Sequence, residues 1–587
     1  MNQIESALIY GQCGHKYKGY IEALCNLESP DIVGTAFSDY TLEQINKVFK
    51  RKKVRSLPDR PTWYDNECRQ KRNELLEISR KKSSELSHKL MLHIKTKEYN
   101  AMKQSKKRNF ASQCCQKIEL AYINDKSSMW KVINGFTREC STNNMPTCDQ
   151  FYDHFRNKSL QKSNERFDYN YENEAIQFLD TNQQVNPINW HYDIDFEILN
   201  KDFDEHEVLN AISKLKNGKS PGPDGIIPEF IKNAKSVFSS NLTQMFNYFI
   251  EHRLFPASWA EGLRNPIFKA GDSFNCSNYR GITVLSMFEK IFEIVILNRL
   301  EFISESFQKK DRYNTGFSKG SRTCDNNFVI MGLVQRQLSL GRPLIVVHVD
   351  FSQAFDLVNR NILFYKLKKS GYKGRVVDTL LDLYRKTSFR VKANGKLSER
   401  VYENIGVNQG GVTSPFLFRE YLADMKDYID EYTGVCITEE ILVHELFADD
   451  LYLLSENVAC AQKQLDGLNK FCSPNQMLVN NIKTKCMVYG HLENVDLRLN
   501  GNEIEKVEQY KSLGTILNSV HSYNGNIFRY NTDFLNNKAR KAIFGIQKKL
   551  KYVRNIQPKH MFYLYESLVI TLWERYMGRK FSMYKKY

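Results

Sequence analysis

The stretch RPLIVVHVDFSQAFDLVNRNILFYKL (342–367) joins a β-branched run to a helical pattern. Residues 345–349 predict a buried strand, because β-branched side chains are favoured in strands. Four apolar residues then recur at helical spacing: Phe355, Val358, Ile362 and Tyr365. Asp350 closes the strand just before the expected helix, where a carboxylate can hold a cation over a cleft. An aspartate in this place can equally cap the helix, so the stretch alone leaves both roles open.

The stretch ILVHELFADDLYLLSE (441–456) places an acidic pair between two apolar runs. Its simplest interpretation is a strand, an acidic turn and a second strand, and most such pairs are plain polar turns. Asp449 and Asp450 nevertheless repel each other unless a cation or solvent screens them.

The two stretches together are more specific than either alone. Carboxylates that end strands far apart in sequence can converge on two Mg²⁺ ions, which stabilise the attacking and leaving oxygens of phosphoryl transfer. Mg²⁺ prefers oxygen ligands and keeps room for substrate phosphates, so a few carboxylates suffice. Asp350, Asp449 and Asp450 are therefore candidates to hold two Mg²⁺ ions.

Composition narrows the class of protein. The 587 residues give room for more than one domain, and the formal net charge of +17 favours a polyanion, either nucleic acid or a membrane surface. We find neither a signal peptide nor a run near the ~20 apolar residues of a membrane helix, and so expect an intracellular chain without a membrane partner. The 13 cysteines lack zinc-site spacing, so we expect free thiols and no structural zinc.

Much of the charge lies near the N-terminus. Residues 50–110 contain 19 Lys and Arg against 7 Asp and Glu. The middle of this segment lacks Pro and Gly, and its Leu and Ile recur at helical spacing, which predicts one or two long basic helices. Both a solvated helical surface and an RNA-binding arm fit this pattern.

The rest of the chain divides by composition. Residues 140–195 are polar and rich in Asn, Asp and Tyr, which predicts a loop-rich connection. A denser, globular pattern runs from 204 to 517. Basic amphipathic helices are expected from about Phe528 onward.

Two motifs resemble those of one enzyme family. Phe-Ala-Asp-Asp (447–450) resembles the aromatic-x-Asp-Asp motif, and Val-Asp-Phe-Ser-Gln-Ala-Phe-Asp (349–356) resembles the first-aspartate motif, of non-LTR (LINE-type) reverse transcriptases. The resemblance implies an α+β, right-hand polymerase with fingers, palm and thumb and a helical basic N-terminal region. It also implies that Asp350 and Asp449 hold both metals and that Asp450 completes the acidic cluster.

The resemblance extends to residues that would bind the nucleotide. NPIFKAGDSFNCSNYRGITVLS (265–286) resembles the fingers motif, in which Lys269 and Arg280 match positions that grip the triphosphate. Gly281 replaces the commoner Pro. Phe355 matches the steric-gate position that selects deoxynucleotides, and Gln409 matches a residue that touches the incoming nucleotide. Each of the two cations can also be a plain surface residue, and Phe355 can also belong to the core.

Further family motifs follow in order along the chain. They are the segment that opens the fingers (215–226), a segment near the template (314–326), the Gln-Gly motif (405–425), a palm motif (478–490), the primer-gripping hairpin (507–517) and the linker that precedes the polymerase (62–82). Ser414 is the expected N-cap of a helix in which Arg419 stands where Asn is commoner. Lys483 matches the lysine proposed to protonate the leaving pyrophosphate, with a solvent-facing Lys as the alternative.

These motifs imply three regions and one reaction. We expect a basic, largely helical, linker-like region at 1–195, fingers and palm at 204–517, and a helical, shortened thumb at 518–587, without a complete endonuclease. The implied function is RNA-directed DNA polymerisation with template RNA, a DNA primer, the RNA–DNA hybrid and dNTPs, in the nucleus and cytoplasm. The alternatives are a catalytically silent, truncated remnant that only binds RNA, and a reverse transcriptase of another class.

Overall fold

The computed structural model describes residues 29–48, 63–80, 86–124, 129–134, 145–160, 164–181, 197–306, 313–318, 320–437, 440–519, 529–550 and 556–570. These residues form mixed helices and sheets, which confirms the α+β class. The chain has two compact units, one made of Met1–Lys52 and Asn144–Glu508, the other of Lys53–Asn143 and Gln509–Tyr587. In the described ranges, no helix is long and apolar enough to cross a membrane.

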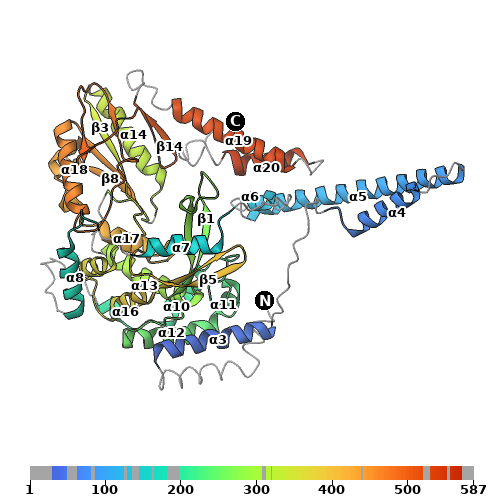
Figure 1. The fold of residues 1–587 in the computed structure, drawn as a ribbon, viewed down its shortest axis with the longest axis horizontal. Helices are drawn as coiled ribbons and strands as arrows, with labels where there is room; N and C mark the ends of the chain where they lie inside the picture. Colours follow the sequence, from blue (N-terminus) through green and yellow to red (C-terminus); the bar gives the residue numbers. More distant parts are fainter. Residues whose placement is uncertain are drawn as a thin grey trace. The chain divides into compact units, whose positions relative to one another are not determined.

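The first unit contains an antiparallel sheet of order β10-β3-β9-β8, here called the β3 sheet. Its strands are β3 (Leu344–Asp350), β8 (His444–Phe447), β9 (Asp450–Ser455) and β10 (Lys485–Tyr489). Every residue of β3 except Asp350 is buried, so the β-branched run forms the predicted buried strand. Helices α14 (Thr323–Ser339) and α18 (Val458–Cys472) lie beside this sheet (Figure 1).

A second sheet of this unit, here called the β1 sheet, has the order β2-β1-β4-β5. Its strands are β1 (Glu261–Phe268), β2 (Tyr279–Val284), β4 (Ser388–Ala393) and β5 (Lys396–Tyr402). Strand β1 pairs antiparallel with β2 and parallel with β4. Helix α7 (Cys148–Ser159) lies beside β5 (Figure 1) and packs on both β4 and β5. Phe151 and Phe155 are buried in the same apolar cluster as Phe389 and Val391.

Most helices of the first unit share one hydrophobic core with the β3 sheet. They are α3 (Pro30–Val48), α8 (Tyr169–Thr181), α9 (Glu197–Asn200), α10 (Glu205–Lys214), α11 (Pro228–Asn233), α12 (Lys235–His252), α13 (Met287–Ser306), α15 (Arg360–Lys369), α16 (Arg375–Lys386) and α17 (Ser414–Leu422). Shorter elements are η2 (Cys276–Asn278), η3 (Met425–Asp427), η4 (Glu431–Thr433), β6 (Val435–Ile437), β7 (Glu440–Leu442), β11 (Arg498–Leu499) and β12 (Asn502–Glu503). Since many of the largest buried side chains are aromatic, ring packing dominates this core.

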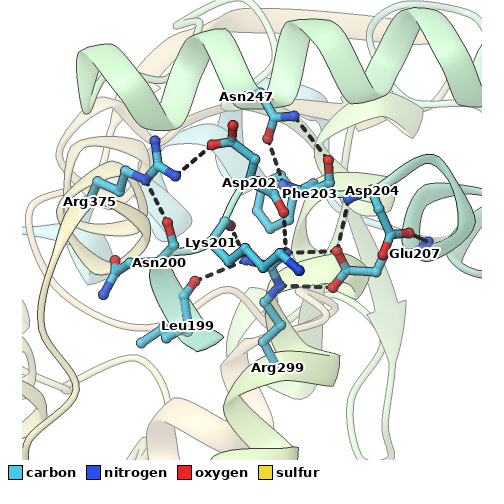
Figure 2. A network of polar contacts seen from close by, with 10 residues as sticks. All are labelled: Leu199, Asn200, Lys201, Asp202, Phe203, Asp204, Glu207, Asn247, Arg299 and Arg375. Atoms are coloured by element: carbon cyan, nitrogen blue, oxygen red, sulfur yellow. Dashed lines mark hydrogen bonds and ion pairs between the residues drawn. The ribbon is translucent and has the colours of Figure 1, made fainter. Parts of the chain in front are cut away.

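Arg299 of α13 ties the segment before α10 to the core (Figure 2). Its Nε and Nη2 groups donate to the Glu207 carboxylate at 2.8 and 2.7 Å. Its remaining donors reach the carbonyls of Leu199, Lys201 and Asp202. All five guanidinium N–H groups therefore have acceptors, although the side chain is only 7% exposed. Asn247 completes the network by bonding both backbone polar groups of Phe203.

The polar composition of residues 140–195 predicts loops, but this expectation is wrong for the described part, which forms α7 and α8. Thr147 accepts a hydrogen bond from the Gln150 amide at 3.2 Å, and the Gln150 side chain accepts one from the Thr147 amide at 2.9 Å. This capping box starts α7. Phe151 and Phe155, four residues apart, then bury one helical face.

The period after Asp350 predicts an immediate helix, but this expectation is also wrong. Residues 352–356 form turns, with Gln353 at φ 52°, and α15 begins at Arg360. Asn359 caps α15, since its side chain accepts from the backbone amides of Asn361 and Ile362. Asp350 is therefore not the cap of this helix.

The second unit combines helices from its two stretches of chain. They are α4 (Asn66–Arg80), α5 (Leu86–Asn124), α6 (Met129–Asn134), α19 (Arg529–Leu550), α20 (Pro558–Tyr565) and the π-helix η6 (Glu566–Ile570), with a hairpin of β13 (Gln509–Ser512) and β14 (Thr515–Asn518). Helices α4 and α5 lie side by side and confirm the predicted basic helices (Figure 1). Helix α5 packs on α20, where Tyr122 stacks on Tyr563 with ring centroids 3.9 Å apart.

Candidate active site

A tight turn carries Asp449 between β8 and β9. Phe447 pairs with Asp450 in the antiparallel register, so Ala448 and Asp449 form a two-residue turn. Ala448 has φ 60°, a left-handed conformation that is uncommon outside glycine. Backbone strain of this kind persists only where the surrounding structure holds it.

The segment just before α14 holds this turn in place. The Leu446 amide donates to the Tyr313 carbonyl at 2.9 Å, and the Thr315 amide donates to the Leu446 carbonyl at 3.0 Å. Gly316 then passes so close that a Cβ on it would lie 2.1 Å from the Ala448 nitrogen. A glycine is therefore required at 316 for the acidic turn to keep its position.

The three predicted carboxylates lie together at one end of the β3 sheet. Asp350 is directly opposite Asp450 in the register of β3 and β9. Burial, followed by the charges of Asp449 and Asp350, raises the pKa of Asp450 to about 6. The Oδ2 atom of Asp350 is buried without a hydrogen-bond partner among the described residues.

Lys483 lies beside the same acidic group. Its Nζ is 3.4 Å from Asp350 Oδ2, an ion pair without hydrogen-bond geometry, and its side chain is 66% exposed. The Asn480 amide donates to the Asp350 carbonyl at 2.8 Å, and the Lys483 amide donates to the Asn480 carbonyl at 3.2 Å. This loop is thereby fixed to the end of β3.

The acidic group fits a divalent cation. A nearby cation would supply a partner to Asp350 Oδ2, which accepts no hydrogen bond from any described residue, and would offset the burial and the like charges that raise the pKa of Asp450. Within the described part of the chain, no group of three or more His, Cys, Asp or Glu side chains is arranged so that it could hold a metal ion by itself. Because Mg²⁺ usually takes one or two carboxylates together with substrate oxygens, an open group suits it.

A pocket rich in cations is formed around the β1 sheet, and we call it the cationic pocket. Its polar lining includes Lys158, Lys269, Arg280, Asp356 and Gln409. Burial, followed by the charges of Arg280 and Lys158, lowers the pKa of Lys269, and Lys483 adds to this effect. The structure thus brings the predicted cations together, close enough to Lys483 to sense its charge.

Gln409 is held in the lining by contacts on both sides. Its side-chain amide donates to Asp356 Oδ1 at 2.9 Å, and its carbonyl accepts from the Thr283 amide at 2.9 Å. Gly410 follows with φ 121°, where a Cβ would lie 2.5 Å from the Thr283 carbonyl oxygen. The glycine permits this close approach of the turn to β2.

Phe355 is half-buried. Its ring stacks on Phe418 of α17 at 4.5 Å between centroids and meets Phe317 edge-on at 6.0 Å. The ring also packs against the main core. A half-buried ring is compatible both with a core role and with the steric gate that the resemblance implies.

Helix α17 begins one residue earlier than the sequence predicts, because Thr413 rather than Ser414 is its N-cap. The buried Glu293 carboxylate accepts from the Val412 amide at 2.8 Å and from the Thr413 hydroxyl at 2.6 Å. A carboxylate at a helix N-terminus is favourable. Arg419 is buried and forms an ion pair with Glu301 at 3.3 Å, so the structure accommodates this departure from the family pattern.

One protein family matches the part of the chain that contains the acidic group. The reverse transcriptase (RNA-dependent DNA polymerase) family model matches residues 267–517. This segment is a reverse transcriptase domain. It contains the three carboxylates, Lys483 and all the nucleotide-binding residues predicted from the sequence, whereas α7 lies outside it.

Polymerases of mobile elements are similar to about half of the chain. The RNA-directed DNA polymerase from mobile element jockey of Drosophila funebris is 25% identical over 320 residues, 53% of this chain and 34% of that protein. The probable polymerases from transposon BS and from the X-element of Drosophila melanogaster are 27% identical over 325 residues (53% and 35%) and 26% identical over 273 residues (46% and 29%). The chain spans about a third of the length of these relatives, and the LINE-type resemblance of the reverse transcriptase domain is confirmed.

Two residues of the site were missed by sequence reasoning. Asp356 belongs to the first-aspartate motif but was given no role of its own, yet it accepts a hydrogen bond from the Gln409 side chain. Lys158 lies outside the motifs, on a helix for which the available signal was the Thr147–Gln150 capping box followed by two phenylalanines four residues apart.

Proposed function

We propose that this chain is an RNA-directed DNA polymerase of the LINE type, with the β1 sheet in the fingers, the β3 sheet in the palm, and β13, β14 and α19 leading into the thumb. The observation that supports this most directly is the group of three carboxylates at the end of the β3 sheet, within a reverse transcriptase domain. The reaction is attack of a primer 3′-hydroxyl on the α-phosphate of a dNTP, with pyrophosphate as the leaving group.

The acidic group is the proposed binding site of two Mg²⁺ ions, with Asp350 and Asp449 as ligands and Asp450 completing the group. When bound, these ions would stabilise charge on the attacking and leaving oxygens. The reverse transcriptase family in general uses divalent metal ions.

The remaining residues have roles that follow from their places. Lys269 and Arg280 bind triphosphate oxygens, the guanidinium as a fork and the ammonium as a point charge. Gln409, held by Asp356, contacts the incoming nucleotide. The Phe355 ring lies under the sugar, where a 2′-hydroxyl would collide with it. Lys483 donates a proton to the leaving pyrophosphate.

Template RNA, the DNA primer and their hybrid are the proposed macromolecular partners. Helices α4 and α5 present exposed cations, among them Arg72, Arg80, Lys89 and Lys97. Contacts of this kind to phosphates release counterions, so RNA binding should weaken steeply as salt rises. Copying at chromosomal DNA would place the chain in the nucleus after its synthesis in the cytoplasm.

Primer extension tests the proposal. The purified chain receives an RNA template with an annealed DNA primer, dNTPs and Mg²⁺, beside Asp449→Asn and a surface control, Asp496→Asn, whose side chain is 58% exposed. We expect extension by the parent and the control, and at least a 1,000-fold loss in Asp449→Asn, because the carboxylate is a proposed metal ligand.

Primer extension and RNA binding by the same purified chain distinguish the polymerase from a chain that only binds RNA. No extension by any variant, with RNA binding that still falls with salt, would replace the polymerase proposal by a silent RNA-binding remnant. RNA binding that does not respond to salt would contradict the role given to the basic helices.

A further inference from the structure

The cationic pocket has more positive than negative charge. Among the described residues, the side chains of Lys269 and Arg280 have no hydrogen-bond or ion-pair partner. Arg264 also lines the pocket, but Glu403 neutralises it at 2.8 Å. Asp356 is then the remaining carboxylate of the lining, and it already accepts a hydrogen bond from Gln409. Cations gathered in this way repel one another unless a polyanion joins them.

Lys158 is the third cation of this lining, and it comes from α7. Its Nζ is 3.9 Å from Asp356 Oδ2, too long for a hydrogen bond, and its side chain is 27% exposed. A long, partly exposed ion pair of this kind contributes little. Because lysine has a flexible stem, its ammonium can leave Asp356 for a stronger acceptor.

The position of α7 is built into the site. A Cβ on Gly281 would lie 2.9 Å from the Phe155 ring and 2.8 Å from Arg264 Cδ. Gly281 directly follows Arg280, which is proposed to bind the triphosphate. Helix α7 can approach this strand so closely only because Gly281 has no side chain. Gly281, which stands where Pro is commoner in the family, is therefore the residue against which the helix that carries Lys158 packs.

We propose that Lys158 is a third triphosphate-binding residue, which exchanges its long contact with Asp356 for the phosphate oxygens of the incoming dNTP. This inference rests on the proposed function of the pocket and adds a residue from outside the reverse transcriptase domain. Asp356 is the positioning residue that holds Gln409 by a hydrogen bond and keeps Lys158 nearby, through the long ion pair, until the triphosphate binds.

The test compares Lys158→Gln with Arg156→Gln, a matched control on the last turn of the same helix whose exposed side chain does not line the pocket. In primer extension by the full chain, Lys158→Gln should raise the KM for dNTP about tenfold, the size of one charge-assisted contact, with kcat changed less than about threefold. Lys158→Arg should restore KM to within about threefold, and Arg156→Gln should leave it unchanged.

A binding measurement separates this inference from the polymerase proposal. Titration of the full chain with inorganic tripolyphosphate at low salt, without primer or template, should show about tenfold weaker binding for Lys158→Gln than for Arg156→Gln. If the parent does not extend primers but this difference remains, the polymerase proposal fails and the pocket assignment stands. Equal binding by the two variants, or no tripolyphosphate binding by the parent, would overturn the role of Lys158.

Discussion

Asp350 and Asp450 face each other across the β3–β9 pair, in direct antiparallel register. This register places one carboxylate at the last residue of a strand and the other at the first residue of its neighbour. Asp449 then lies in the turn one residue away. The sheet therefore concentrates negative charge at one end, and this charge adds to the burial that raises the pKa of Asp450.

Asp450→Asn should stabilise the chain in the absence of Mg²⁺. The folded-state pKa of Asp450 is about 6, above the ordinary value of 3.8, so the folded state binds its proton more tightly than the unfolded state. The stability that this group contributes is present at low pH and is lost as the pH rises from about 4 through 6. The substitution should therefore raise the free energy of unfolding by about 1 kcal/mol more at pH 8 than at pH 5. Urea unfolding at both pH values measures this, and a gain that is larger at pH 5 would contradict the assignment.

Gly316→Ala should reduce primer extension about 100-fold, since a displacement of about 1 Å near reacting groups has effects of this size. The new Cβ would meet the Ala448 nitrogen and move the turn that carries Asp449. The matched control is Gly332→Ala on α14, where a Cβ would have nothing within 4 Å. Equal activity of the two variants in steady-state extension would show that the close approach at 316 does not position the turn.

Phe355→Val should weaken discrimination against ribonucleotides by about 10- to 100-fold, because removing ring volume opens space beside the sugar. The ratio of kcat/KM for dNTP and rNTP measures this effect. Phe328→Val is the control, since Phe328 is 78% exposed. A variant that loses stability but keeps its sugar selectivity would leave Phe355 with the core role alone.

Arg299→Met should destabilise the first unit by about 3–5 kcal/mol, because three backbone carbonyls lose their Arg299 donor and, among the described residues, the Glu207 carboxylate keeps only the Asp204 amide. Arg498→Met, at an ion pair with both side chains about 60% exposed, should cost less than about 1 kcal/mol. Urea unfolding of both variants provides the comparison. Similar losses would mean that the network in Figure 2 contributes no more than a surface pair.

Local patterns were enough for several predictions. The β-branched run before Asp350 predicted its strand, and the apolar runs around Asp449 predicted the β8–β9 hairpin, because strand propensity and period act over a few residues. The basic helices α4 and α5 followed from helical spacing without Pro or Gly. The turn after Asp350 was not predicted, since Gln353 adopts a positive φ that its residue type does not favour.

The sequence by itself determined that this chain resembles a reverse transcriptase domain. Its carboxylates and cations are the residue types that two-metal phosphoryl transfer needs, and the motifs that contain them follow one another in the family's order along the sequence. Only the tertiary structure decided that Gly316 holds the acidic turn, that Asp356 bonds Gln409, and that Lys158 reaches the same pocket. These relationships join residues separated by 53 to more than 100 positions, and no local propensity records them. They arise when the sheets and helices pack, because close packing then fixes which distant side chains share one small volume.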